Sequence, residues 1–116
     1  MRNLLMLAAA LCCTPGEAAQ GTGPGLPTVV RVEFVLDCMR EHEGSEYELV
    51  NKCSCALDRL AERYSPDDFI EGLTLSKAVT IAGERGAALR DNKAAQSQAR
   101  KFREAYAAAR RACFLQ

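Results

Sequence analysis

The chain has 116 residues, a length that suits one domain, and its 15 basic and 15 acidic side chains leave no net charge. A single histidine excludes a pair of metal-spaced histidines, and neither a glycine-rich phosphate loop nor a recognisable Ser, His and Asp arrangement is found. The commonest enzyme signatures are therefore missing, and we expect a protein that acts by binding, without a cofactor and without catalysis.

The first 18 residues have the pattern of a cleaved signal peptide. Arg2 precedes an uncharged apolar run of about ten residues, and Ala18 ends a small-residue stretch suited to signal peptidase. The run is shorter than the roughly 20 residues of a spanning helix, so we expect no transmembrane segment in the mature chain. We predict a periplasmic or secreted protein, cleaved after Ala18 or one of the next two residues, with a flexible leader at 19–27 and one helical domain at 28–116.

Apolar spacing predicts four helices and no strand. The first covers residues 28–43 and stops at Gly44, a residue suited to a left-handed helix end. The second covers residues 45–64 and begins with Ser45, which makes a capping box with Glu48. Their predicted core positions recur every three or four residues: Val29, Val32, Leu36 and Met39 in the first helix, and Val50, Cys53, Leu57 and Leu60 in the second.

The third predicted helix covers residues 65–82, where Ser65 is the cap and Pro66 occupies the first helical position. A loop at 83–91 and a last helix at 92–113 complete the chain. The predicted core positions are Phe69, Ile70, Leu73, Val79 and Ala82 in the third helix, and Ala95, Ala99, Phe102, Tyr106, Ala109 and Cys113 in the last. Short connections favour a small all-α fold, a four-helix up-down bundle stapled by disulfides.

Four cysteines follow the predicted signal peptide: Cys38, Cys53, Cys55 and Cys113. An even number in a short exported chain predicts two structural disulfides. Cys53 lies on the apolar stripe of its helix, whereas Cys55 points about 200° away, so these two cannot pair with each other. A tight hairpin of the first two helices slightly favours Cys38 with Cys53 and Cys55 with Cys113. The core position of Cys113 is the argument for the alternative, in which it pairs with Cys53.

The same cysteines support a second hypothesis, a Cys-x-Cys metallochaperone or thiol redox protein. Cys53, Cys55, Cys38 and His42 are the candidate ligands for a soft metal, but two opposed faces of one helix would have to converge on the ion. A redox thiol is usually found in Cys-x-x-Cys at a helix N-terminus, which this chain lacks. We therefore expect no metal centre. A third hypothesis is an envelope structural or chaperone-like protein.

Charge is distributed unevenly along the chain. Residues 28–84 contain 12 acidic and 6 basic side chains, a balance of −6, whereas residues 85–116 contain 8 basic and 2 acidic ones, a balance of +6. The favoured interpretation is that the basic last helix forms weak surface ion pairs with the acidic helices. The alternative is that Arg100, Arg103 and Arg110 bind a protein partner or an anionic envelope surface. We do not expect nucleic acid, because the chain is predicted to be exported and no aromatic residues alternate with these bases.

A stretch from Tyr47 to Ala61 contains Cys53-Ser54-Cys55, and it is followed by Asp67-Asp68-Phe69 and by a terminal Cys113. In this combination the chain resembles small uncharacterised periplasmic proteins with four cysteines, such as those associated with quinoprotein alcohol dehydrogenase systems in Gram-negative bacteria. The resemblance covers most of the mature chain, and its one sharp motif is the cysteine triplet. It implies an accessory role in periplasmic oxidation and no catalytic residue.

Overall fold

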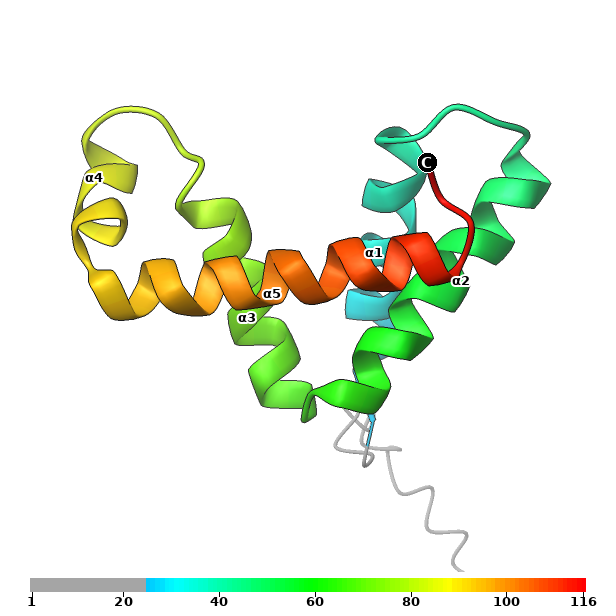
Figure 1. The fold of residues 1–116 in the computed structure, drawn as a ribbon, viewed down its shortest axis with the longest axis horizontal. Helices are drawn as coiled ribbons and strands as arrows, with labels where there is room; N and C mark the ends of the chain where they lie inside the picture. The colour runs from blue at the N-terminus through cyan, green and yellow to red at the C-terminus, as the bar shows by residue number, and fades with distance from the viewer. Residues whose placement is uncertain (1–24) are drawn as a thin grey trace, which may run out of the picture.

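A computed structural model describes residues 25–116, which form five helices and no strand. The helices are α1 (Thr28–Arg40), α2 (Glu46–Arg63), α3 (Pro66–Ala78), α4 (Glu84–Asp91) and α5 (Lys93–Ala112) (Figure 1). The all-α prediction is confirmed for this part of the chain. The predicted signal peptide and residues 19–24 of the predicted leader lie outside the described residues. Leu26, near the end of that leader, packs against the core.

Three helices begin at side chains that cap them. Ser45 and Ser65 each accept a hydrogen bond at Oγ from the amide three residues later, at 3.3 and 3.2 Å. Asn92 accepts bonds at Oδ1 from two amides of the first turn of α5, at 3.0 and 3.1 Å. The first amides of a helix have no partner within it, so these side chains determine where α2, α3 and α5 start.

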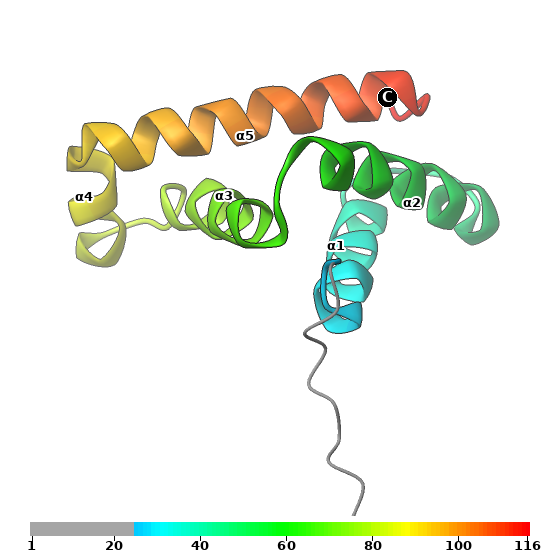
Figure 2. The same cartoon turned by 90° about the horizontal axis from the view of Figure 1, so that it is seen from below.

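The helices do not form the predicted four-helix up-down bundle. Helix α5 spans the molecule and packs along both α3 and α2, while α1 packs on α2 and points away from α5 (Figures 1 and 2). Tyr64 and Ser65, which join α2 to α3, are both extended, so α3 leaves α2 at an angle instead of folding back along it. A 20-residue helix is about 30 Å long, which lets α5 cross both α3 and α2.

Aromatic side chains from three helices form the centre of the core. Phe102 of α5 lies 5.5 Å from Phe69 of α3, between ring centroids, and Phe69 lies 5.7 Å from Phe34 of α1. Gly72 of α3 faces the Phe102 ring so closely that an added Cβ would lie 2.5 Å from its Cδ2 atom. The missing side chain at Gly72 therefore lets α3 and α5 approach each other.

The predicted core face of the first helix is wrong at three of its four positions, while the fourth, Met39, packs against the core. Val29, Val32 and Leu36 are 61%, 50% and 49% exposed, and the residues of α1 that are buried are Phe34 and Cys38. In the second helix Val50, also predicted as core, is 40% exposed.

Helix α1 packs along α2, and Phe34 also contacts Phe69 of α3 and Tyr106 of α5. The disulfide at Cys38 lies on the same side of the helix as Phe34. The helix also ends at Arg40, about one turn before the predicted end at residue 43.

The segment predicted as a loop at residues 83–91 contains helix α4. Gly83 precedes it with φ of +78°, a left-handed conformation that glycine adopts without strain. Gly86 is buried, and a Cβ there would overlap the carbonyl of Ile81, so α4 lies directly against the preceding turn. Two glycines and eight residues leave too little periodicity to indicate a helix. Ala82, predicted as core at the end of α3, is exposed in this turn.

Candidate functional site

Two disulfides cross-link the described residues. One joins Cys38 of α1 to Cys53 of α2 with an S–S distance of 2.02 Å, and the other joins Cys55 of α2 to Cys113 at the end of α5, at 2.01 Å. Cys53 is fully buried and Cys55 is half-buried, as the opposed faces of one helix require. All four sulfurs are therefore used to tie α2 to two different helices.

His42 has a structural contact in place of a metal-binding one. Its Nδ1 atom lies 2.9 Å from the carbonyl oxygen of Cys38, so the half-buried ring covers the last turn of α1. The Cys38 sulfur, its expected co-ligand, is bonded to Cys53. Among residues 25–116 no three His, Cys, Asp or Glu side chains are grouped so that they could hold a metal ion. The residues considered as ligands from the sequence are thus not brought together around one point.

Among residues 25–116, the ion pairs that join two helices do not involve the basic last helix. Arg31 of α1 pairs with Asp58 of α2 at 2.8 Å, and Asp37 of α1 pairs with Lys77 of α3. The hydrogen bond from Lys77 is the main reason that the pKa of Asp37 lies below its usual value, with the charges of Lys77 and Arg40 adding to it. Within residues 25–116, α5 has one ion pair, internal to the helix, between Arg100 Nε and Glu104 at 4.0 Å. The favoured interpretation, in which α5 pairs with the acidic helices, finds no such pair in the structure.

Arg100 and Arg103 lie beside a surface hollow at the end of α3. The hollow has a volume of about 320 Å³ and is lined by Val79, Thr80, Arg90, Gln96, Arg100 and Arg103. Gln96, Arg100 and Arg103 are at spacings of four and three, so they lie on one flank of α5, next to the buried stripe that packs on α3. Three arginines and no carboxylate surround this hollow.

Sequence reasoning found two of these three arginines. Arg100 and Arg103 were identified from the charge of the last helix, whereas Arg90 was placed in a loop and was missed. Arg90 comes to the hollow because α4 folds back toward α5 (Figure 2). The spacing of Gln96 with the two arginines was the available signal for a polar stripe, but nothing in the sequence indicated where α4 would lie.

Arg110, the third predicted candidate, has a different environment. Its guanidinium carbon lies 4.8 Å from the centroid of the Tyr106 ring, and its side chain is half-buried there. Burial raises the pKa of Tyr106 to about 12; the charge of Glu41 adds to this increase and that of Arg110 opposes it. Arg110 thus contributes to packing between α5 and α1, and we separate it from the exposed pair Arg100 and Arg103.

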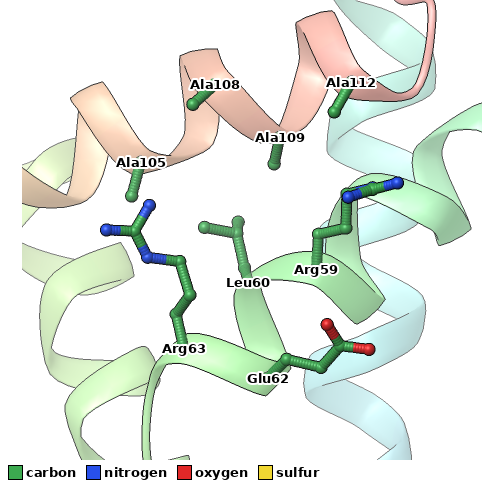
Figure 3. A pocket seen from close by; sticks show the side chains of 8 residues that line it. All are labelled: Arg59, Leu60, Glu62, Arg63, Ala105, Ala108, Ala109 and Ala112. Carbon is green, nitrogen blue, oxygen red and sulfur yellow. The ribbon is translucent and has the colours of Figure 1, made fainter.

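A second cleft lies between α2 and α5, on another side of the last helix. It has a volume of about 290 Å³, and Figure 3 shows Arg59 and Arg63 projecting from α2 on either side of Leu60, opposite alanines of α5. Arg59 and Arg63 are exposed and have no ion pair among residues 25–116. The alanine wall is part of the α2–α5 packing, since Ala105 and Ala109 are buried. This cleft has two positive charges and also contains Glu62, so it is less basic than the hollow at α3.

None of the helices in residues 25–116 is long and apolar enough to cross a membrane. Comparisons with protein-family models, with curated proteins and with solved structures found no match to the chain.

Proposed function

We propose that this protein is an exported, non-catalytic binding or accessory module of the periplasm, stabilised by two disulfides. Support for export comes from the signal-peptide pattern at residues 1–18 and from the four paired cysteines, because disulfides form and persist in oxidising compartments. A domain of fewer than 100 residues buries only a small core, so covalent cross-links are a physically reasonable way to supply the stability that a larger core would give.

The observation that carries the proposal is the unpaired positive charge at Arg100 and Arg103 of α5. Both side chains are exposed, Arg103 has no ion pair among the described residues, and Arg100 has only the 4.0 Å contact with Glu104. Basic groups that the fold does not neutralise are available to an anionic partner, where they raise the association rate and select for complementary charge. We infer that α5 binds the acidic surface of a protein partner or an anionic envelope surface.

The proposal is tested with the double variant Arg100→Glu/Arg103→Glu. Cross-linking in an envelope fraction should recover an associated component with the natural protein and lose it with this variant. The matched control is Arg59→Glu/Arg63→Glu, which makes the same change of net charge on α2 and should keep the association. Equal loss in both variants would show that only the total charge matters, and no loss in either would contradict the proposal. Circular dichroism should give unchanged thermal midpoints for both.

Intact mass spectrometry tests export and the state of the cysteines together. We expect a mature chain that starts at Ala19 and takes up alkyl groups only after reduction, one for each of its four cysteines. Free thiols in the unreduced protein, or a bound metal in its native mass, would instead favour the metallochaperone or thiol redox hypothesis.

A further inference from the structure

The hollow beside Arg100 is bounded by three elements that are not neighbours in sequence. Val79 and Thr80 come from the end of α3, Arg90 from α4, and the remaining lining residues from one flank of α5. A volume of about 320 Å³ is within the range of small-ligand sites, and three of its six lining residues are arginines. Several positive groups around one hollow, with no carboxylate among the lining residues, attract an anion.

Arg90 is held in place by the turn before α4. Its guanidinium donates hydrogen bonds to the carbonyl oxygens of Ile81 and of Gly83, the second at 2.9 Å. A guanidinium has five N–H donors, so these two bonds leave three for a ligand. Because the turn already orders this side chain, little rotamer entropy remains to be lost when an anion binds.

Arg100 and Arg103 lie across the hollow from α4 and are much less constrained. Arg103 has no hydrogen bond or ion pair among the described residues, and Arg100 has the single 4.0 Å contact with Glu104. The Thr80 hydroxyl donates its one proton to the carbonyl of Lys77 at 2.7 Å, so Thr80 lines the hollow without offering a donor to an anion. Gln96 adds an amide with two N–H donors.

We propose that this hollow binds a phosphate group. Three guanidiniums and an amide offer more donors than one carboxylate can accept, whereas a phosphate monoester has three terminal oxygens and a charge near −2. Arginine binds phosphate oxygens in pairs through its planar fork, which suits a site with Arg90 on one side and two arginines on the other. This inference rests on the proposed function, because it gives the chemical class of anion that the exposed bases of α5 recognise.

A phosphate group can belong to a lipid headgroup or to a soluble compound, and the experiment distinguishes these two sources. Isothermal titration calorimetry with inorganic phosphate at low salt measures the group by itself, and amide shifts in NMR spectra locate it. Sedimentation with phosphatidylcholine vesicles, with and without phosphatidic acid, measures a lipid headgroup. The protein should bind one phosphate, with shifts at Thr80, Arg90 and Gln96. If the protein binds vesicles that contain phosphatidic acid but not vesicles of phosphatidylcholine alone, and if free phosphate displaces it, the source is a lipid headgroup. If it binds free phosphate and neither kind of vesicle, the source is a soluble compound.

Matched glutamine variants decide whether the hollow is responsible. Arg100→Gln and Arg103→Gln should each weaken phosphate binding about tenfold or more, because a charge-assisted hydrogen bond contributes at least 1.4 kcal/mol, which is a factor of ten. Lys101→Gln removes one charge from the same helix outside the hollow and should change the dissociation constant less than about twofold. Equal weakening by Lys101→Gln, or no one-to-one binding by the natural protein, would overturn the proposal.

The two proposals fail in different ways. If phosphate does not bind, yet Arg100→Glu/Arg103→Glu still removes the envelope component, the α5 surface binds another anion and only the phosphate site is wrong. If phosphate binds with the expected variant pattern but the envelope association survives that double variant, the hollow is a phosphate site and the accessory role of α5 is wrong.

Discussion

The disulfide between Cys55 and Cys113 closes the longer of two loops, and its removal tests how the fold is held together. It joins residues 58 positions apart, compared with 15 for Cys38 and Cys53. In the chain-entropy model the longer loop stabilises the fold by about 4 kcal/mol and the shorter by about 3 kcal/mol. Since small domains have total stabilities of about 5–15 kcal/mol, opening the longer loop should remove a large part of the free energy of unfolding.

The measurement compares Cys55→Ala, Cys113→Ala and the double variant by urea unfolding, followed by circular dichroism with free thiols alkylated. Each single substitution opens the same loop, so each should lower the free energy of unfolding by about 4 kcal/mol, and the double variant should lose hardly more. The dependence on urea should also steepen, because an uncrosslinked unfolded chain exposes more surface. Losses that simply add in the double variant, or a loss below about 1 kcal/mol, would refute this reasoning.

Three further predictions concern packing, titration and backbone conformation. Gly72→Ala should lower the free energy of unfolding, measured by urea titration, by about 1 kcal/mol or more, because the added Cβ would press on Phe102. The control is Thr74→Ala at an exposed position of the same helix, which should not lower the free energy of unfolding. Absorbance titration should show that Tyr106 ionises near pH 12. Because its folded pKa exceeds the ordinary value of 10.0, its contribution to stability is full below pH 10 and is lost as the pH rises through about 12. A titration in which no tyrosine ionises near pH 12 would contradict this. Phe114 is 78% exposed and has a φ of +59°, a left-handed conformation that favours glycine. Phe114→Gly should therefore raise the stability measured by calorimetry by about 1 kcal/mol. A less stable variant would mean that the Phe114 side chain stabilises the fold.

The starts of α2, α3 and α5 were readable in the sequence because the signal is local. Ser45, Ser65 with Pro66, and Asn92 supply caps whose hydrogen bonds span two or three residues, and the structure contains those bonds. The stripe on the last helix was readable for the same reason, since Ala99 and Phe102 recur at helical spacing and are buried. The opposed directions of Cys53 and Cys55 likewise follow from the helical repeat alone.

Which apolar stripe faces a neighbour was decided by tertiary structure. Helix α1 carries a regular stripe that includes Val32 and Leu36, yet Phe34 and Cys38 are the residues that are buried. Aromatic rings of α3 and α5 and the disulfide to α2 lie on their side of the helix. Periodicity reports that a helix has an apolar face, but it contains no information about how many neighbours are available to cover it.

The candidate site, too, has one part that the sequence indicated and one part that only the tertiary structure decided. The charge of the last helix led to the prediction of Arg100, Arg103 and Arg110 as partner-binding residues, of which the first two line the hollow. Gln96 was not predicted, although its helical spacing from Arg100 and Arg103 puts it on the same flank of α5. Only the tertiary structure brought Arg90 to the same hollow, because the turn at Gly83 and the close approach at Gly86 fold α4 back against the end of α3. A hollow made from three separate elements depends on the path of the chain through space, whereas caps, stripes and charge balance depend only on residues a few positions apart.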